Sequence, residues 1–307
     1  MCPQQSSVAI LLATYNGGEF LIPQLNSFCS QSYPSWKLYV SDDGSTDNTL
    51  SILESFSSHD SGINVYAGPK KGFAQNFISL IKRQDIEASY YAFSDQDDIW
   101  CKDKLARAVG FLKDIHPDIP ALYCSRTKLI DSSGNEIGYS TFYKKPPGFG
   151  HSLIQNIASG NTMVFNHSAK KMLESAYGKP IVAHDWTLYQ IVSACGGVVF
   201  YDEKPTLLYR QHGGNLIGSG LNPLQRMNNF FAALNGRTAK WNDINLSILQ
   251  CGELKLSADA SKKIQCIKEM RNSNLLRRVK IYHSSGLYHQ NLIGTLTNYC
   301  YAVLNKF

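Results

Sequence analysis

The 307-residue sequence has no uninterrupted apolar stretch of the roughly 18 residues that a membrane-spanning helix needs. Its first seven residues, Met1 to Ser7, also lack the basic and apolar regions of a secretory signal peptide, so no leader is expected. The eight cysteines are scattered, and none of them forms a Cys-x-x-Cys pair. This spacing argues against a zinc site and against a disulfide framework, and it favours the reducing cytoplasm as the location.

Acidic residues are nearly absent from the last part of the chain. From Lys262 to Phe307 the one acidic residue is Glu269, against eight lysines and arginines, although the whole chain carries a formal charge of only +6. We therefore expect an anionic partner to bind this segment. Apolar residues are interleaved with the basic ones between Lys262 and Ile281. This pattern suits an amphipathic surface on anionic lipid, the solvated face of a helical cap, or an oligomer contact.

The order of apolar patterns predicts an α/β domain followed by helices. Hydrophobic residues make up 43% of the chain, enough for the core of one large domain with appendages. The first half alternates strand-like and helix-like stretches, which predicts a mostly parallel, doubly wound sheet. We expect a domain over residues 1–221, with halves at about 1–120 and 121–221. A basic, helical region is expected over residues 222–307, with the boundary near Asn222.

Short apolar runs and helical spacing predict the individual elements. The expected strands lie at Val8–Leu12, Lys37–Val40, Ile63–Tyr66, Tyr90–Phe93, Leu122–Ser125, Thr162–Phe165 and Gly197–Tyr201. The expected helices lie at Leu21–Cys29, from Thr49, after Gly72, at Lys104–Leu112 and at Trp186–Cys195. A turn at Ser132–Asn135 predicts a hairpin.

Two expected strands end in carboxylates. Asp95, Asp97 and Asp98 follow one strand directly, and Asp42 and Asp43 follow another. Packed carboxylates raise one another's pKa unless a positive charge lies among them. The natural partner is a hard divalent cation that also holds phosphate oxygens. Because the carboxyl ends of parallel strands share one edge of the sheet, a metal-assisted nucleotide site is expected there.

Two structural alternatives exist for the stronger acidic motif. An EF-hand calcium loop would need an oxygen ligand and a glycine where Ile99 and Trp100 stand, so that alternative is disfavoured. The other alternative is an acidic turn between a strand and a helix, with Asp98 as the helix cap.

Three segments resemble, in the correct order, the signatures of glycosyltransferase family 2. They are Ala13-Thr14-Tyr15-Asn16, Asp42-Asp43-Gly44-Ser45-Thr46-Asp47 and Ser94-Asp95-Gln96-Asp97-Asp98-Ile99-Trp100. The third is similar to the bacterial rhamnosyltransferase-like branch that contains O-antigen and capsule enzymes. The resemblance runs from about Ser7 to about Gly218. It implies an inverting, nucleotide-sugar-dependent enzyme with the GT-A fold, a Rossmann-like sheet flanked by helices, here with a helical C-terminal extension.

The resemblance also implies roles in binding the donor. Asp97 is the expected direct ligand of Mn²⁺ or Mg²⁺, while Asp95 is expected to face the ribose or the sugar. The carboxylate of Asp42 or Asp43 would accept the imide N–H of uracil or thymine, unless the segment is a plain Asp-Gly turn. The other expected donor-binding residues are Thr14, Tyr15, Asn16, Lys71 and Gln96. The loop that holds Lys71 could equally be a solvated start of a helix.

The resemblance assigns the catalytic base to His184-Asp185-Trp186. An inverting transfer needs one base to accept the proton of the attacking hydroxyl, and Asp185 at a helix start would have its ionised form favoured. The alternative is a helix cap, with His184 on the surface. His212 is expected as a further metal ligand or, with Arg210, as a contact of the diphosphate, unless it is only a loop residue. The expected acceptor and sugar pocket contains Trp100, Gly160, Asn161, His184, Trp186 and Arg210.

The expected function is therefore a metal-dependent, inverting hexosyl transfer. The donor would be a UDP- or dTDP-sugar of rhamnose, galactose or glucose, and the acceptor a lipid-linked intermediate of a surface polysaccharide. The protein would be cytoplasmic and peripheral on the inner face of the membrane, without a nucleic-acid partner, and its oligomeric state stays open. A sugar nucleotidyltransferase is the rival enzyme, but Asn16–Glu19 lacks the basic residue that its loop needs. The non-enzyme rival is a carbohydrate-binding module with a degenerate site, which the intact Asp97 and Asp185 disfavour.

Overall fold

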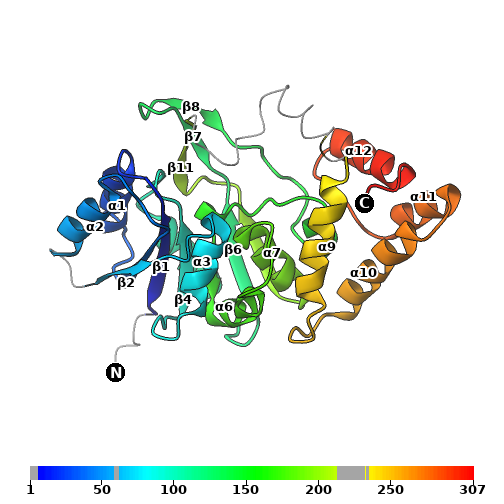
Figure 1. The fold of residues 1–307 in the computed structure, drawn as a ribbon, viewed down its shortest axis with the longest axis horizontal. Helices are drawn as coiled ribbons and strands as arrows, with labels where there is room; N and C mark the ends of the chain where they lie inside the picture. Colours follow the sequence, from blue (N-terminus) through cyan, green and yellow to red (C-terminus); the bar gives the residue numbers. More distant parts are fainter. Residues whose placement is uncertain (1–5, 59–61, 213–231, 233–234) are drawn as a thin grey trace.

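The computed structural model describes residues 6–58, 62–212, 232 and 235–307. Among these residues, seven strands form the central sheet (Figure 1). They are β1 Val8–Thr14, β2 Trp36–Asp42, β3 Ile63–Ala67, β4 Tyr90–Ser94, β6 Ala121–Ser125, β9 Val164–Asn166 and β10 Val198–Asp202. Their spatial order is β10-β6-β9-β4-β1-β2-β3.

The central sheet is mostly parallel, as predicted. β1 pairs in parallel with β2 and β4, β2 with β3, and β10 with β6, whereas β9 is antiparallel to both of its neighbours. Along β1, Ala9 and Leu11 belong to one hydrophobic core, and Ile10 and Leu12 belong to the other. Both faces of the strand are therefore covered, which explains its continuous apolar run.

Helices cover the two faces of the sheet. The helices and helical turns of this part are α1 Leu21–Cys29, α2 Thr49–Ser57, α3 Phe73–Lys82, α4 Lys104–Leu112, α5 Phe149–Ser152, η1 Gly160–Thr162, α6 His167–Leu173, η2 Glu174–Ala176 and α7 His184–Ala194. Buried residues of α3, α6 and α7 share one core, called the first core below. Buried residues of α1, α2 and α4 share the second core. This doubly wound arrangement is the predicted fold class.

A second, four-stranded sheet among the described residues lies at the top of the view in Figure 1. Its strands are β5 Ile99–Trp100, β11 Leu207–Arg210, β7 Lys128–Ile130 and β8 Glu136–Tyr139, in that spatial order. β7 and β8 form the predicted hairpin, in which Gly134 takes a positive φ of 89°. The pairing of β11 with the two-residue β5 was not predicted, because so short a strand leaves no periodicity to detect.

The chain ends in helices that pack against the first core, at the right of Figure 1. These helices are α9 Arg237–Leu249, α10 Ala258–Arg271, α11 Leu275–Ser284 and α12 Leu292–Val303. Ser257, Asn274 and Asn291 cap the last three, each accepting a hydrogen bond from a backbone N–H of the first turn. The helical C-terminal region is thus confirmed, while the boundary near Asn222 lies outside the described residues.

The structure corrects one expectation for this region. Ile264 and Ile267 of α10 are buried in the first core, so the apolar residues of this helix cannot also lie on lipid. Within the described ranges, no helix is long and apolar enough to cross a membrane. The seven cysteines that the structure describes are all free thiols.

Candidate active site

The turn after β2 is held by a carboxylate that was expected to bind the base. Asp42 is buried, and its Oδ1 accepts a hydrogen bond of 3.1 Å from the hydroxyl of Thr14 at the end of β1. Its Oδ2 accepts the backbone N–H groups of Gly44 and Ser45, at 3.1 and 2.8 Å. Asp42 therefore fixes the strand ends on which a nucleotide site would be built, and its reading of a base stays a prediction.

Asp43 links this turn to the loop that follows β3. Its two carboxylate oxygens accept the backbone N–H groups of Lys70 and Gly72, at 2.6 and 2.8 Å. Lys70 has a positive φ of 56°, a conformation that these hydrogen bonds support. Lys71 lies between the two donors, and its side chain is exposed. The loop is thus ordered by Asp43 and presents two exposed lysines, Lys70 and Lys71.

The side-chain amide of Gln96 forms two hydrogen bonds with the backbone just after β1. It accepts from the backbone N–H of Tyr15 at 2.9 Å and donates to the carbonyl of the same residue at 3.1 Å. Asn16 takes a positive φ of 47°, and its side chain accepts from the backbone N–H of Thr46 at 2.8 Å. The side chain of Tyr15 is 57% exposed. Of these expected donor-binding residues, Tyr15 offers the free aromatic surface.

Asp97 and His212 meet although 115 positions separate them in the sequence. Nε2 of His212 lies 2.8 Å from Oδ2 of Asp97. Among the described residues there is no group of three or more His, Cys, Asp or Glu that could hold a metal ion. Carboxylate and imidazole both suit Mn²⁺, and metals that bind nucleotides usually complete their shell with phosphate oxygens and water. Two protein ligands therefore fit a metal that is shared with a diphosphate.

Asp98 and Lys104 form a buried layer beneath this pair. Asp98 is fully buried and accepts a hydrogen bond of 2.6 Å from the side-chain amide of Asn161. Lys104 has 0% exposure, and its ammonium donates to the carbonyl oxygen of Asn161. Asn161, expected in the sugar pocket, therefore joins the acidic motif to the only lysine that is fully buried in the described part of the chain.

The titration behaviour of these groups reflects crowded negative charge. Burial, followed by the charges of Asp97 and Asp185, raises the pKa of Asp95 to about 7. Burial, followed by the charges of Asp97 and Asp95, raises the pKa of Asp98 well above its usual range. Burial also lowers the pKa of Lys104 to about 7, although Asp98 and Asp95 oppose this shift. One buried lysine does not neutralise the cluster, so a bound cation would be stabilised.

Asp185 lies in the first turn of α7 and is linked to the acidic motif through η1, in which Gly160 contacts Asp185 and Asn161 contacts Asp98. Its Oδ2 accepts hydrogen bonds of 3.0 Å from the side-chain amide of Asn156 and from the backbone N–H of Gly160. Its Oδ1 accepts from the backbone N–H of Trp186 at 2.6 Å. Burial nevertheless raises the pKa of Asp185. The expectation that the helix start favours the ionised form is therefore wrong, because burial outweighs the donors.

His184 is neither a pocket-lining nor a surface residue. Its ring stacks on Phe77 with centroids 3.9 Å apart and meets Phe93 edge-on at 4.7 Å. Both ring nitrogens are buried without a hydrogen-bond partner among the described residues. Burial lowers the pKa of His184 to about 3, so the imidazole is neutral. The structure thus places this residue in the core, behind Asp185.

Trp100 and Trp186, both expected in the sugar pocket, differ in their surroundings, and the place of Trp186 in that pocket stays a prediction. Trp100 is 3% exposed, meets Phe28 edge-on at 4.7 Å and lies 3.7 Å from the ammonium of Lys104. This enclosure corrects its assignment to the pocket. Trp186 donates its indole N–H to the carbonyl of Ser152 at 2.6 Å and packs edge-on against Trp241 of α9. Trp186 therefore joins the helix of the expected base to the C-terminal helices.

Arg210 supports the acidic motif instead of facing a diphosphate. It is buried, and its Nε donates to the carbonyl of Asp97 at 3.0 Å. Its Nη1 donates to the carbonyls of Asp131 and Ser132 in the hairpin, at 3.3 and 2.9 Å. The Nε and Nη1 groups of the guanidinium thus bind backbone carbonyls, which disfavours its assignment as a diphosphate contact. It holds the metal-motif loop against the second sheet.

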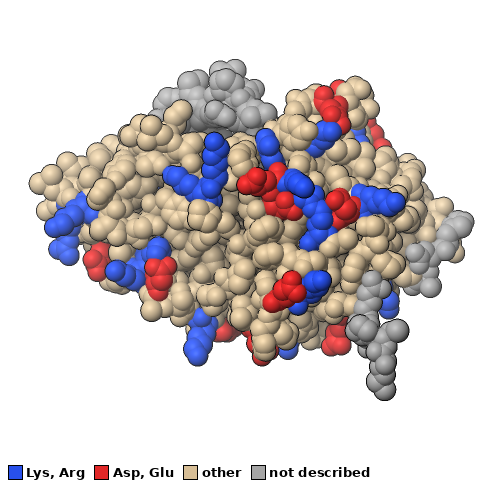
Figure 2. Space-filling model, turned by 180° about the vertical axis from the view of Figure 1, so that it is seen from behind, with Lys and Arg blue, Asp and Glu red and all other residues tan. Residues whose placement is uncertain are grey.

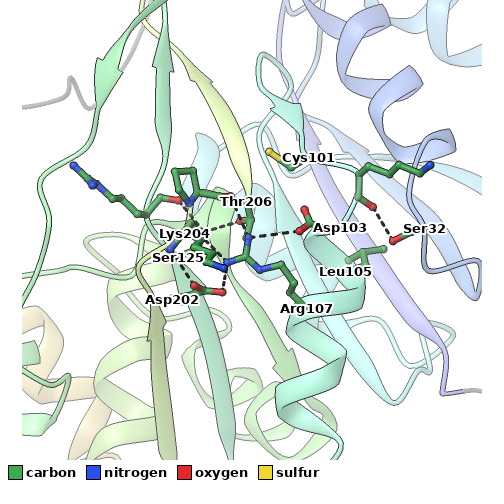
Figure 3. Close-up of polar contacts among 12 residues, drawn as sticks. Ser32, Cys101, Asp103, Leu105, Arg107, Ser125, Asp202, Lys204 and Thr206 are labelled. Atoms are coloured by element: carbon green, nitrogen blue, oxygen red, sulfur yellow. Dashed lines mark hydrogen bonds and ion pairs between the residues drawn. The ribbon is translucent and has the colours of Figure 1, made fainter.

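A polar cluster anchors the strand that carries Arg210 (Figure 3). Arg107 of α4 forms an ion pair with Asp202 at the end of β10 and a longer one, 3.7 Å, with Asp103. The hydroxyl groups of Ser125 and Thr206 lie 2.6 Å apart, just before β11 begins. These contacts fix the start of β11 against α4 and the central sheet, and so fix the position of the residues at its end.

Sequence reasoning missed Lys104 and Asn156, although the first gave a signal. Lys104 lies four and eight positions before Ala108 and Leu112, so it occupies the apolar face of α4, where a lysine must be paired or buried at a cost. Asn156 gave no signal, because it lies in an irregular segment and reaches Asp185 only in the folded chain.

Comparison with known proteins places this geometry in a family. The model of glycosyl transferase family 2 matches residues 9–176, which is more than half of the chain. The chain belongs to glycosyl transferase family 2. The family membership and the enzyme class predicted from the three motifs are thereby confirmed, and the nucleotidyltransferase and binding-module alternatives are set aside.

Two relatives of this family 2 chain are named as bacterial sugar transferases. It is 34% identical over 223 residues to the dTDP-rhamnosyl transferase RfbG of Shigella flexneri, covering 68% of this chain and 74% of that protein. It is 24% identical over 236 residues to an Escherichia coli protein, covering 74% of this chain and 86% of the relative. The relative is named UDP-Glc:alpha-D-GlcNAc-diphosphoundecaprenol beta-1,3-glucosyltransferase WfaP.

Solved structures show the same fold. The structure of S. aureus TarS residues 1–349 in complex with UDP-GlcNAc has a TM-score of 0.57 and 16% sequence identity, covering 97% of this chain and 81% of that one. At this identity the likeness concerns the fold alone. With the mixed sheet and the C-terminal helices described above, it confirms the predicted GT-A-like architecture.

Proposed function

We propose that this family 2 enzyme transfers a sugar from a UDP- or dTDP-sugar, with inversion and with the help of Mn²⁺ or Mg²⁺, to a lipid-linked intermediate of a surface polysaccharide. One observation carries the proposal. The carboxylate of Asp97 lies 2.8 Å from His212, and the turn η1 links Asp185 to the same motif, because Gly160 donates to Asp185 at 3.0 Å and Asn161 donates to Asp98 at 2.6 Å. This geometry supports a site in which a pair of metal-ligand type and the proposed base act together.

The residues present fit a divalent cation shared with substrate. Asp97 and His212 would hold it, and Asp95 would face the ribose or the sugar. The cation would supply positive charge to the diphosphate as that group leaves. The chain contributes the positioning: Arg210 holds the backbone of Asp97, and Asp98 with Asn161 and Lys104 supports the motif from below.

Asp185 is the proposed base of the transfer. Asn156, the Gly160 N–H and the Trp186 N–H fix the direction of its carboxylate. Its raised pKa makes it a better proton acceptor than an ordinary carboxylate, provided that it is ionised at the working pH. As the acceptor hydroxyl attacks the anomeric carbon, its proton passes to Asp185 while the bond to the diphosphate breaks. One direct displacement of this kind inverts the anomeric configuration.

The donor and acceptor follow from the relatives and the turn at Asp42. A dTDP-rhamnosyl transferase and a UDP-glucose-dependent enzyme are both similar to this chain, so dTDP-rhamnose, UDP-glucose and UDP-galactose are the proposed donors. A diphosphoundecaprenol-linked acceptor, as named for the second relative, would place the reaction at the cytoplasmic face of the membrane. We further propose residues 1–221 as the catalytic domain and 222–307 as the region that brings it to that membrane.

Donor hydrolysis without an acceptor tests this proposal. Purified protein with Mn²⁺ or Mg²⁺ should slowly hydrolyse at least one sugar of a UDP- and dTDP-sugar panel, and UDP or dTDP should bind more tightly than GDP or ADP in calorimetry. Asp97→Asn should abolish the hydrolysis and weaken metal-dependent nucleotide binding, because an amide has no charge to hold the cation. Asp118→Asn is the control, since its carboxylate is 91% exposed.

Two results would contradict the proposal. Undiminished hydrolysis by Asp97→Asn, or by the unmodified protein in excess EDTA, would remove the metal assignment. Equal affinity for all four nucleoside diphosphates would remove the pyrimidine-reading role of the Asp42-Asp43 turn.

A further inference from the structure

The outward face of α12 is apolar, although it lies on the surface. Leu292, Ile293 and Leu296 are 73%, 76% and 57% exposed. Val303 and Leu304, at the other end of the helix, are also exposed. A helix on the surface of a globular protein normally carries polar side chains on its outer face. An exposed apolar stripe of this kind indicates an interaction surface.

The stripe follows the helical repeat. Positions 292, 296, 300 and 303 are spaced by three or four residues, so their side chains share one face of the helix. The residues of α12 that are buried, Asn298, Tyr301 and Ala302, point the opposite way, into the molecule. No charged residue occurs between Leu292 and Val303. Nothing on this helix therefore opposes entry of its outer face into an apolar environment.

Exposed basic side chains lie on the antiparallel neighbour of α12, the helix α11. The two helices are joined by a hydrogen bond of 2.8 Å between His283 and Tyr299 and one of 2.9 Å from Arg278 to the carbonyl of Val303. Arg277 and Lys280 of α11 are exposed. Leu276, beside them, is 82% exposed. No acidic residue occurs in the sequence from position 270 to the last residue, so these charges have no counter-charge nearby in the chain.

We propose that this surface, the outer face of α12 with the exposed basic residues of α11, binds the surface of an anionic lipid bilayer. A 12-residue helix is about 18 Å long, too short to cross a hydrocarbon core of roughly 30 Å, so α12 lies in the plane of the interface. Anionic headgroups would complement Arg277 and Lys280. A second copy of this chain would instead bring like charges together.

Other charged surfaces of the molecule lack the features of the α11–α12 surface. Figure 2 shows the rear of the molecule, where lysine and arginine side chains are interspersed with aspartate and glutamate. On the buried side of α10, Ile264 and Ile267 face the core, so that helix offers charge without exposed apolar area. The combination of an exposed apolar stripe with exposed basic residues in a segment that has no acidic residue distinguishes α12 and α11 from these surfaces.

The segment that leads into α12 is hydrogen-bonded to the proposed catalytic domain, residues 1–221. Gln290 accepts from the backbone N–H of Lys145 at 2.9 Å and donates to its carbonyl at 2.8 Å, and the hydroxyl of Tyr288 donates to the carbonyl of Pro146 at 2.6 Å. From Lys145 and Pro146 the chain continues through α5 to Asn156, which donates a hydrogen bond to Asp185. A bilayer on α12 would therefore hold the site in a fixed orientation. This last step rests on the proposed function, because it assumes a lipid-linked acceptor.

Vesicle binding by the full chain tests the surface. The unmodified protein should co-sediment with vesicles that contain phosphatidylglycerol more strongly than with pure phosphatidylcholine. The triple variant Leu292→Gln, Ile293→Gln, Leu296→Gln should bind at least about tenfold more weakly, because it removes exposed apolar area. The matched control changes three exposed apolar residues elsewhere, Ile22→Gln, Leu50→Gln and Ile137→Gln, and should bind normally. Arg277→Gln with Lys280→Gln should lower binding on the order of fivefold per charge at low salt, and by less at high salt.

The outcomes separate this inference from the proposed function. Vesicle binding needs no transfer, so binding without donor hydrolysis would retain the lipid surface and remove only the enzyme assignment. Three results would overturn the lipid surface: no binding by the unmodified protein, unchanged binding by the α12 triple variant, or a dimer in sedimentation that this variant makes monomeric while vesicle binding persists. The last result would identify the face as a contact between two copies.

Discussion

Neighbouring residues at the start of α7 show how one cause gives opposite titration behaviour. Burial raises the pKa of Asp185 and lowers that of His184 to about 3, because burial disfavours the charged form of either group. The carboxylate has three hydrogen-bond donors and faces the acidic motif, whereas the imidazole has none among the described residues and lies between aromatic rings. Asp185 is therefore suited to accept a proton, whereas His184 is suited to pack in the core.

Replacing Asp185 with asparagine should separate donor binding from chemistry. An amide cannot accept the proton, so turnover should fall by about 10²–10⁴-fold while UDP or dTDP binding changes little. In the unmodified enzyme, turnover should fall as the pH drops through the pKa of Asp185. Because that pKa is raised, the fall should begin at a higher pH than for an exposed carboxylate. Steady-state kinetics and calorimetry are the measurements. Near-normal turnover of the variant, or a product that NMR shows to retain the donor configuration, would contradict the role.

The buried His184 should make the protein less stable in acid. Its pKa is about 3 when folded and about 6.5 when unfolded, so between these values the unfolded state binds more protons. The free energy of unfolding should therefore fall as the pH drops below about 6.5, by at most about 1.4 kcal/mol per pH unit from this residue. Urea unfolding of His184→Phe between pH 7 and pH 5 should show a shallower loss. The exposed control His116→Gln should match the unmodified slope, and equal slopes for all three proteins would refute the assignment.

At the scale of elements, the turn η1 is fitted closely against the start of α7. Gly160 donates its N–H to Asp185, and a Cβ at this position would lie 2.7 Å from Nε2 of His184. The next residue, Asn161, binds both the carboxylate of Asp98 and, through its carbonyl, Lys104. One short turn therefore connects the proposed base to the layer beneath the metal motif, and its position fixes both.

Gly160→Ala should impair activity more than stability. The added methyl group must displace either the packed imidazole or the turn, and both movements shift the partners of Asp185. We expect turnover to fall at least about tenfold, since small misplacements of catalytic groups are costly. Gly110→Ala in α4 is the matched control, because nothing lies within 4 Å of its Cβ position, and alanine there should stabilise the helix by roughly 0.5–1 kcal/mol. Equal turnover in both variants would show that the close fit does not matter.

At the scale of the whole molecule, the C-terminal helices are part of the main core. One hydrophobic cluster contains Leu122 of the central sheet, Leu188 of α7, and Leu249, Ile267 and Tyr301 of the C-terminal helices. The packing of Trp186 against Trp241 adds to this contact. Although the sequence divides into an α/β part and a helical part, the two parts share buried apolar area.

The protein should therefore unfold in one cooperative transition. Tryptophan fluorescence and far-ultraviolet circular dichroism should give the same urea midpoint, since the shared core cannot open in one part alone. A fragment that ends at residue 257 should be aggregated or unfolded, because it exposes the apolar surface that α10 and α12 cover. Two separate transitions, or a soluble fragment with its own cooperative unfolding, would refute this expectation.

The sequence predicted those features that depend on neighbours along the chain. The continuous apolar run at β1 predicts a strand covered on both faces, and the acids after β2 and β4 predict polar strand ends at one edge. These signals are local, so they survive without knowledge of packing. Lys104 was missed although its helical spacing placed it on the apolar face of α4. The two-residue β5 was missed because it is defined only by its partner, β11.

By itself, then, the sequence determined the central sheet, the order of the three motifs and the family. Apolar periodicity and the acidic residues at strand ends depend only on residues that are close together in the sequence. Only the tertiary structure decided which of the expected site residues lie in the core. Trp100 and His184 were expected in the pocket, and their contacts with aromatic rings place them in the core. Arg210 was expected on the diphosphate, and its Nε and Nη1 groups bind backbone carbonyls. The physical reason is that the same charged or aromatic residue type can bind a substrate in one protein and pack in the core of another. The contacts made by distant segments decide between these roles, as they do where His212 meets Asp97 and Asn156 meets Asp185.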